Sequence, residues 1–158
     1  MLRAIDMTEP FLPSYQPRYA MGLGTPAQLV ELVARGVDMF DCVLPTRVAR
    51  NGTAFTRKGS ISIKAGACKA DFGPIDQGCD CFACRHFTRA YLRHLLNVGE
   101  ILGLRMLSVH NTRIYLKVME EVRAAIADGT FGEYRREFVA NYVPTQKVLL
   151  ARAAEAER

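Results

Sequence analysis

Three cysteines and a histidine carry the clearest chemistry in this chain. Cys79, Cys81 and Cys84 lie within six residues of one another, and His110 follows at the head of a helical pattern. Thiolate and imidazole are the ligands that a tetrahedral Zn²⁺ prefers, and four of them fill its coordination shell. Because a full shell leaves no position for an activated water, we expect one structural Zn²⁺ per chain and no metal-based catalysis.

The remaining histidines and cysteines are weaker candidates for this metal site. His86 follows the cluster too closely to share its tetrahedron easily, and His94 lies on an amphipathic helical pattern, so each is a minor alternative to His110. Three free thiols in a loop are the other alternative, but such dense cysteines would be prone to oxidation. Of the lone cysteines, Cys42 is predicted to be a buried small residue and Cys68 a loop thiol.

A single carboxylate, Asp41, is the best candidate for a reactive group. It follows the apolar pair Met39-Phe40 at the end of a predicted strand. The carboxyl ends of parallel strands are where α/β folds place catalytic groups. An aspartate that merely caps a turn is the alternative, and position alone favours it.

The elements around Asp41 predict a strand, a helix and a second strand. Residues 19–24 are an apolar run that ends in Gly-Leu-Gly, and residues 39–44 are a second run that stops at Pro45. Between them, Thr25-Pro26 is typical of a helix start and Gly36 of a helix end. A strand, a helix and a strand with short connections form a βαβ unit, so the two strands should be parallel neighbours in an α/β fold.

The rest of the chain predicts loops and helices. Residues 46–52 are basic and resemble a turn, and residues 65–78 are a glycine-rich loop with little core of its own. Metal removal should therefore unfold residues 65–110 first. The other expected elements are a helical turn over 2–7, a hairpin of 53–56 with 60–64, helices over 87–102, 108–127 and 131–142, and a charged tail over 145–158.

Composition bounds the class of protein. The 158 residues suffice for one domain, about half of them are apolar, and the formal charge is +5 with a pI near 9.1. Clustered arginines (Arg47, Arg50 and Arg57, then Arg85, Arg89 and Arg93) are compatible with either a polyanionic partner or a solvated surface. No signal-peptide pattern is visible, and no apolar run approaches the ~20 residues that span a bilayer. We expect a cytoplasmic protein without a membrane partner.

Several motifs, in matching order, resemble one enzyme family. Residues 37–47 and 49–52 (VDMFDCVLPTR, then ARNG) resemble the signature of the tRNA-guanine transglycosylases, also called queuine tRNA-ribosyltransferases. Residues 18–26 resemble the preceding strand and loop of that family, and the cysteine cluster resembles its zinc site. Residues 88–94, 99–103 and 110–111 also match, so the resemblance runs almost continuously over residues 2–142.

This resemblance implies a fold and its divisions. The family fold is a (β/α)₈ TIM barrel with an inserted zinc-binding subdomain. By resemblance, residues 1–52 hold barrel strands seven and eight with the anticodon-contacting loops, residues 53–110 form the zinc-binding subdomain, residues 111–142 hold the closing barrel helix and a C-terminal helix, and residues 143–158 form a tail.

The resemblance also implies an activity in queuosine biosynthesis. The family exchanges guanine at the wobble position of tRNAs with GUN anticodons for a 7-deazaguanine, either 7-aminomethyl-7-deazaguanine or queuine. Asp41 aligns with the nucleophile that forms a covalent ribosyl intermediate, and Met21 aligns with a residue of the base pocket. The aligned anticodon-contacting residues are Gly22, Leu23, Gly24, Thr25, Pro26, Ala27, Gln28, Thr46, Arg47, Val48, Ala49 and Arg50. The chain departs from the pattern at Val48, where asparagine is usual, and at residues 65–68, which lack Asn-Ala-Arg.

A barrel needs about 250 residues, and only two of its strands are predicted here. We therefore expect an incomplete portion of the enzyme, inactive alone, which would form a homodimer at full length with the zinc subdomain taking part. A split-enzyme subunit, or a non-catalytic zinc-bearing partner for tRNA docking and dimerisation, is the alternative. An intact motif around Asp41 favours the enzyme, since an accessory role has no use for a nucleophile.

Overall fold

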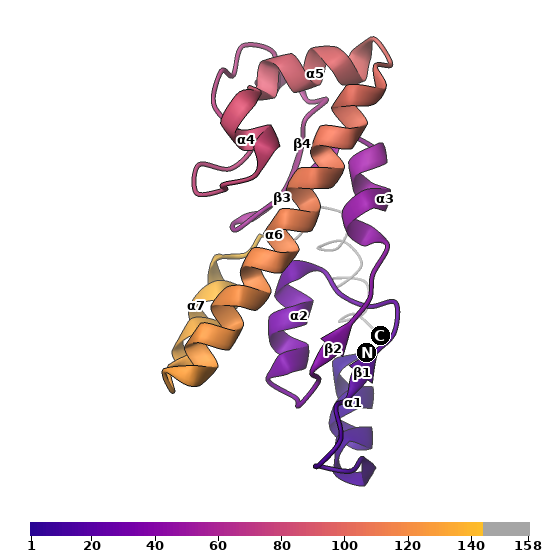
Figure 1. The fold of residues 1–158 in the computed structure, drawn as a ribbon, viewed down its shortest axis with the longest axis vertical. Coiled ribbons are helices and arrows are strands. Elements are labelled where there is room, and N and C mark those ends of the chain that lie inside the picture. Colours follow the sequence, from indigo (N-terminus) through magenta and orange to yellow (C-terminus); the bar gives the residue numbers. More distant parts are fainter. Residues whose placement is uncertain (144–158) are drawn as a thin grey trace, which may run out of the picture. The chain divides into compact units, whose positions relative to one another are not determined.

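A computed structural model describes residues 1–143, which form a mixed α/β fold with the expected parallel strand pair. The expected tail over 145–158 lies outside the described residues. In chain order the elements are α1 (Leu2–Thr8), the 3₁₀ turn η1 (Glu9–Phe11), β1 (Tyr19–Ala20), α2 (Pro26–Val33), β2 (Met39–Phe40), α3 (Leu44–Arg50), β3 (Thr53–Thr56), β4 (Gly59–Ser62), the 3₁₀ turn η2 (Gly66–Cys68), α4 (Phe82–His86), α5 (Arg89–Asn97), α6 (Ile101–Ala127) and α7 (Phe131–Asn141) (Figure 1).

These elements divide into two compact units. Among the described residues, the first unit comprises Met1–Leu44 and Tyr115–Val139, and the second comprises Pro45–Ile114 and residues 140–143. The long helix α6 supplies its first half to the second unit and its second half to the first.

The first unit is built on the predicted βαβ motif. Strands β1 and β2 are parallel neighbours, with Tyr19 opposite Met39 and Ala20 opposite Phe40. Helix α2 between them begins as predicted, because Thr25 and Gln28 form a capping box in which each side chain binds the other residue's backbone N–H. The βαβ prediction is therefore confirmed.

Both strands are shorter than expected. The run from Tyr19 to Gly24 is extended only over its first two residues, because Gly22 and Gly24 adopt positive φ angles of 70° and 119° and turn the chain. The second strand, expected to reach Leu44, ends at Phe40. The expected turn over residues 46–52 is wrong, since α3 occupies Leu44–Arg50. Proline lacks a backbone N–H, but the N–H groups of a first helical turn have no partner within the helix. Pro45 is therefore accommodated in the first turn of α3, where the sequence had predicted only the end of a strand.

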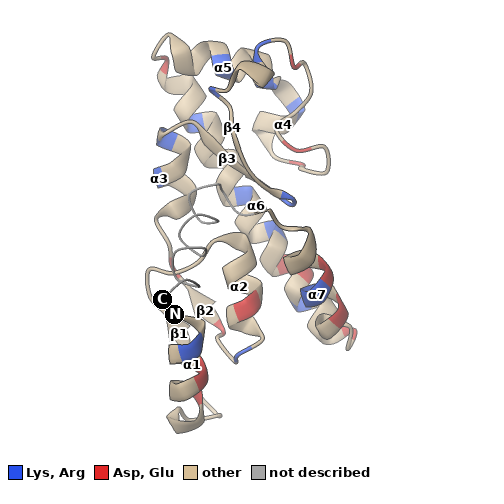
Figure 2. Ribbon diagram, turned by 180° about the vertical axis from the view of Figure 1, so that it is seen from behind, with Lys and Arg blue, Asp and Glu red and all other residues tan. Residues whose placement is uncertain are grey.

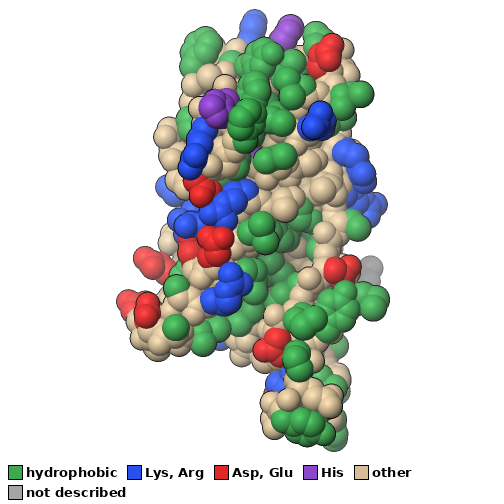
Figure 3. Space-filling model, in the orientation of Figure 1, with side chains coloured by type: hydrophobic (Ala, Val, Ile, Leu, Met, Phe, Trp, Pro, Cys, Tyr) green, Lys and Arg blue, Asp and Glu red, His purple; other side chains and the backbone are tan. Residues whose placement is uncertain are grey.

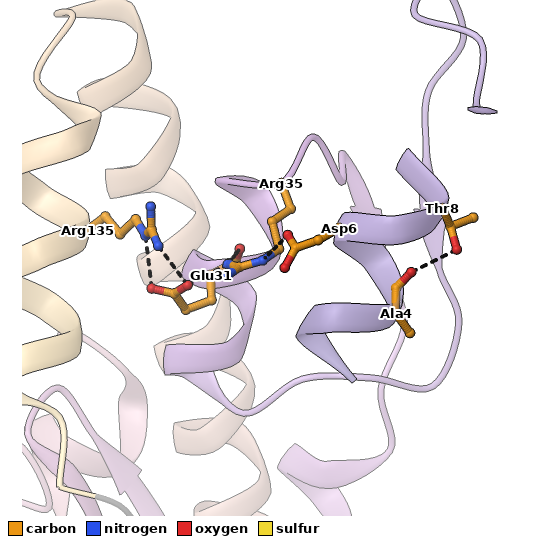
Figure 4. Close-up of polar contacts among 6 residues, drawn as sticks. All are labelled: Ala4, Asp6, Thr8, Glu31, Arg35 and Arg135. Carbon is orange, nitrogen blue, oxygen red and sulfur yellow. Dashed lines mark hydrogen bonds and ion pairs between the residues drawn. The ribbon is translucent and has the colours of Figure 1, made fainter. Parts of the chain in front are cut away.

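A small core and a chain of ion pairs hold the first unit together. Ala20, Leu32 and Val37 are buried against Ile5 of α1 and Phe40 of β2. Around them, side chains of opposite charge link three helices. Arg135 of α7 binds both carboxylate oxygens of Glu31 at 2.9 and 3.0 Å, Glu31 binds Arg35 at 2.5 Å, and Arg35 reaches Asp6 of α1 at 2.8 Å (Figure 4).

The second unit has a larger core. Strands β3 and β4 form the predicted hairpin, which turns at Arg57-Lys58 with Thr56 opposite Gly59. Buried apolar residues from every part of this unit pack together; they are Ala49, Ala54, Ile63, Ile75, Cys81, Ala83, Leu92, Leu95, Leu96, Met106 and Leu107.

The helix expected over 87–102 is found only over Arg89–Asn97, because the chain is interrupted at Gly99. Thr88 caps the start of α5, and Gly99 adopts a φ of 78° after its end. The Glu100 N–H then bonds back to the Leu95 carbonyl at 2.9 Å, a pairing typical of a glycine-terminated helix. A new helix, α6, starts at Ile101 rather than at the expected residue 108, so His110 lies inside a helix and not at its head.

Two of the clustered arginines serve the second unit internally. Arg89 binds Asp71 and the Ile75 carbonyl, both at 2.8 Å, and Arg93 bonds to the Ala65 carbonyl at 3.1 Å. These bonds fasten the glycine-rich loop over 65–78 to α5. Loop anchoring therefore accounts for Arg89 and Arg93, whereas Arg85, expected on the same helix, lies on α4 and is exposed.

Candidate functional site

The four predicted metal ligands converge in the second unit. The sulfurs of Cys79, Cys81 and Cys84 and one nitrogen of His110 all lie within 4.8 Å of one another. His110 Nδ1 is 3.2 Å from the Cys84 sulfur and 3.6 Å from the Cys81 sulfur. A Zn²⁺ with bonds of about 2.3 Å to sulfur and 2.0 Å to nitrogen separates its tetrahedral ligands by roughly 3.5 Å, so this donor set fits the ion.

A backbone carbonyl orients the histidine ligand. His110 is fully buried, and its Nε2 lies 2.7 Å from the carbonyl oxygen of Phe55 on β3. A carbonyl can only accept a hydrogen bond, so Nε2 carries the proton and Nδ1 is left with the lone pair that a metal needs. The rivals His86 and His94 are both exposed, and neither belongs to the cluster.

Hydrogen bonds among the three cysteines change the pKa values of two of their thiols. Hydrogen bonds from the Cys79 and Cys84 thiols lower the pKa of Cys81 to about 3, so this sulfur is a thiolate at neutral pH. Hydrogen bonds with Cys79 and Cys81, together with burial, raise the pKa of Cys84, so this thiol keeps its proton beside the Cys81 thiolate. A bound dication would displace that proton, since metal-ligating thiols are deprotonated.

A charged pair holds the metal loop on its helix. Asp80, between the first two cysteines, receives two hydrogen bonds from Arg113 of α6, at 2.6 and 2.8 Å. The two lone cysteines are distributed opposite to the prediction. Cys68 is buried beneath the loop, and burial raises the pKa of its thiol, whereas Cys42 is only half-buried. Cys68 is the last residue of the 3₁₀ turn η2, and the spacing of the cysteines does not reveal its burial.

The candidate nucleophile lies in the first unit, one residue beyond β2. Asp41 Oδ1 accepts a hydrogen bond from the Tyr19 hydroxyl at 2.6 Å and another from the Gly22 backbone N–H at 2.8 Å. These bonds, with a smaller contribution from its own backbone N–H, lower the pKa of Asp41. The side chain is thus a fixed, ionised carboxylate, which suits nucleophilic attack.

Tyr19 is a site residue that the sequence did not reveal. Its bond to Asp41 raises the pKa of the Tyr19 hydroxyl, which therefore stays a donor at neutral pH. The strand register places it there, because Tyr19 lies opposite Met39 and side chains two residues apart in a strand share a face. Register combined with this alternation is the signal that could have found it.

The described residues do not enclose Asp41. Its side chain is exposed, as is Met21, whose exposed fraction is 74%. A hollow of about 220 Å³ in the first unit is lined by Leu29, Phe40 and Tyr115, among others, but contains neither of these two residues.

Comparison with known proteins decides the family. A model of the family "Queuine tRNA-ribosyltransferase" matches residues 1–144.

The chain belongs to the queuine tRNA-ribosyltransferase family.

Individual relatives agree with this membership. A queuine tRNA-ribosyltransferase of Symbiobacterium thermophilum is 51% identical over all 158 residues, which correspond to 37% of the relative. The enzyme of that name from Bacillus subtilis is 49% identical over 90% of this chain and 37% of the relative, and one from Thiobacillus denitrificans is 54% identical over 92% and 39%. The chain therefore spans less than two-fifths of the length of the curated relatives it matches.

The residues that match the family's anticodon-contacting segments differ in burial: some are buried and others are exposed. In the loop over 22–28, Gly24 and Pro26 are buried, the Gly24 carbonyl accepts a bond from the Tyr115 hydroxyl, and Thr25 and Gln28 cap α2. On α3, Pro45 and Ala49 are buried, whereas Thr46, Arg47 and Arg50 are exposed. Figure 2 shows the basic positions of α3 in blue.

A membrane-spanning role finds no support among the described helices, since none combines the length and the apolar character needed to cross a bilayer.

Proposed function

We propose that the protein containing this chain is a tRNA-guanine transglycosylase, in which Asp41 attacks the ribose of the wobble nucleotide. The observation that carries this proposal is the exposed carboxylate held by Tyr19 and Gly22 at the carboxyl end of a parallel strand. A carboxylate kept ionised and oriented in this way needs no further activation to act as a nucleophile.

The reaction proceeds by two displacements at C1′ of the ribose. Asp41 forms a bond to C1′ while the bond to guanine breaks, and guanine leaves with the electron pair and gains a proton. The incoming 7-deazaguanine gives up its N9 proton and bonds to C1′, which releases Asp41 as a carboxylate. Dividing one displacement into two is the strategy of retaining glycosidases. Guanine must first leave its stack, which costs a few kcal/mol.

The short parallel pair fits a place in a larger barrel. We propose that β1 and β2 are the seventh and eighth strands of a (β/α)₈ barrel, that residues 53–110 are its zinc subdomain, and that α6 closes it. Support comes from the order of strand, helix and parallel strand in β1, α2 and β2. It also comes from Asp41, which lies at the strand end where barrel enzymes carry their catalytic groups.

Two segments would bind the anticodon loop in the cytoplasm, where tRNA is modified. We propose that Thr46, Arg47 and Arg50 of α3 contact RNA directly, since their side chains are exposed and two are cationic. Val48 and the buried Ala49 would shape the helix. The loop over 22–28 would contribute mainly backbone groups, because Thr25, Pro26 and Gln28 are already used to begin α2. Met21 would line the base pocket.

Zinc would serve structure alone. Cys79, Cys81, Cys84 and His110 would hold it, and the ion would supply cross-linking between the loop and α6 rather than an activated water.

Replacement of Asp41 tests the proposal. In the full-length protein, Asp41→Asn should reduce incorporation of labelled guanine into tRNA by about 1,000-fold or more, because an amide is a poor nucleophile. Asp128→Asn, at an exposed position after α6, is the matched control and should leave exchange unchanged. A ribosyl-linked protein–RNA species should be seen on denaturing gels with wild type and the control only. Undiminished exchange by Asp41→Asn would refute the enzymatic proposal and leave the docking role.

We also propose that the full-length protein forms a homodimer through α4 and α5. A half-buried ring, Phe87, and two exposed rings, Tyr91 and His94, lie there in a continuous stack, with ring centroids 5.7 Å apart for Phe87 and Tyr91 and 6.5 Å apart for Tyr91 and His94. Figure 3 shows apolar side chains beside two histidines on this face. Exposed aromatic clusters are typical of protein interfaces. Tyr91→Ala should shift the dimer toward monomer in sedimentation experiments, whereas Tyr15→Ala should not.

A further inference from the structure

A buried asparagine next to a metal ligand uses its whole side chain to hold backbone. Asn111 is fully buried on α6, directly after His110. Its Oδ1 accepts a hydrogen bond from the Phe55 N–H at 2.8 Å, and its Nδ2 donates to the Pro45 and Thr53 carbonyls at 2.9 and 3.0 Å. An amide group has two N–H donors and one carbonyl acceptor, so every polar group of Asn111 is engaged.

The backbone held by Asn111 brackets helix α3. Pro45 lies in the first turn of α3, and Thr53 follows just after its end. The helix therefore cannot shift along α6 without breaking a buried hydrogen bond at one of its two ends. A broken bond of this kind leaves a buried polar group unpaired, which is more unfavourable than the loss of an exposed bond.

The metal site shares this scaffold. The Phe55 carbonyl accepts a bond from the ligand His110, and the Phe55 N–H donates to Asn111, so two consecutive residues of α6 grip one residue of β3. One turn further along α3 from Pro45, Ala49 is fully buried in the core that contains the ligand Cys81. The residues that would hold zinc and the helix that presents Arg47 and Arg50 thus rest on the same contacts.

We infer that Asn111 is a positioning residue for RNA binding, which fixes α3 on the metal-braced framework of α6 and β3. This inference rests on the proposed function, since it assigns α3 to the anticodon loop. Asn111 touches neither the ribose nor the reactive carboxylate. Its loss should weaken binding of the anticodon loop while the metal remains bound.

The test compares variants of the full-length, zinc-loaded protein. Asn111→Asp keeps the shape and the acceptor for the Phe55 N–H, but sets a carboxylate oxygen against two carbonyls. Asn97→Asp makes the same chemical change at an exposed position of the second unit and is the matched control. Asn111→Ser, which is neutral and smaller, separates lost hydrogen bonds from added charge. Five quantities are measured: zinc content, the Kd of an anticodon stem-loop RNA, KM for tRNA, kcat for tRNA, and deuterium exchange of residues 45–55.

We expect Asn111→Asp to retain one zinc per chain, raise the Kd of the stem-loop about tenfold and raise KM equally, with kcat little changed. Exchange of backbone amides in α3 should accelerate. Asn111→Ser should change the same quantities in the same direction by a smaller factor, and Asn97→Asp should change none. If Asn111→Asp fails to fold, Asn111→Ser decides.

Two results would overturn separate claims. Unchanged Kd and unchanged exchange of α3 in a folded Asn111 variant would refute the positioning role. A wild-type protein that does not bind the stem-loop would refute the proposed function. In that case faster exchange of α3 in the variants would still show that Asn111 holds this helix, but the link to RNA would be lost.

Discussion

The two units of this chain hold their candidate sites in opposite ways. In the second unit, four ligand atoms lie together within a packed core, and His110 is fully buried. In the first unit, Asp41 stands exposed beyond two short strands, held by one tyrosine and one backbone amide. A metal site is complete once its ligands converge, whereas a nucleophile needs a substrate pocket that the described residues do not enclose. Membership of the family is thus plain from residues that form only part of an active site.

The two units should differ most in stability when metal is removed. Structural zinc contributes ~10 kcal/mol or more to the folding of small sites, so chelation or Cys81→Ser should unfold much of the second unit. Limited proteolysis should cut residues 65–110 first, while β1, α2 and β2 of the first unit stay protected. His86→Ala, at an exposed histidine outside the cluster, should behave like wild type. Equal protection of both units after metal loss would contradict this comparison.

Loss of a single hydroxyl group, that of Tyr19, should change the pKa and the reactivity of Asp41. Tyr19→Phe deletes the hydrogen bond that contributes most to the lowered pKa of Asp41, so that pKa should rise. Because the carboxylate must be ionised to attack, the acidic limb of the pH profile for kcat/KM should move to higher pH. We expect base exchange at neutral pH to fall about tenfold, since orientation is lost with the bond. Tyr15→Phe in the full-length protein, at an exposed tyrosine outside the strands, is the control. Identical pH profiles for wild type, Tyr19→Phe and Tyr15→Phe would contradict the role of Tyr19.

The smallest effect is expected for the ion pairs that link α1, α2 and α7. Glu31→Gln removes the carboxylate that binds both Arg35 and Arg135, and should destabilise the first unit by about 1 kcal/mol, since partly exposed ion pairs contribute little. Arg135 lowers the pKa of Glu31, so this stabilisation is present above the usual pKa of a glutamate and is lost as pH falls through the lowered value.

Thermal unfolding of wild type and Glu31→Gln should therefore differ at neutral pH and converge in acid. Glu137→Gln, an exposed change on α7, provides the baseline. A constant difference at all pH values would mean that Glu31 acts through packing rather than charge.

Local signals predicted the parts of both sites that depend on neighbours in the chain. The spacing of the cysteines identified the metal loop, and the Thr25-Pro26 cap identified α2 and so the βαβ unit. Neighbouring residues were misleading at two positions. Pro45 can end a strand and also begin a helix, and Gly99 separates two helices within the range predicted as one. Tyr19 and Asn111 escaped notice because their partners are distant in the sequence, 22 residues away for Asp41 and up to 66 for Pro45.

The hydrogen bond that orients His110 restricts the length of the hairpin more than the identity of its residues. The acceptor that sets the His110 ring is the main-chain oxygen of Phe55, not a side chain. Every amino acid offers that oxygen, so exchange of residue 55 for another that fits the strand leaves the ring's orientation intact. An inserted or deleted residue in the hairpin would displace it. Substitution of residue 55 should therefore preserve the ring's orientation, whereas a change in hairpin length should disturb it.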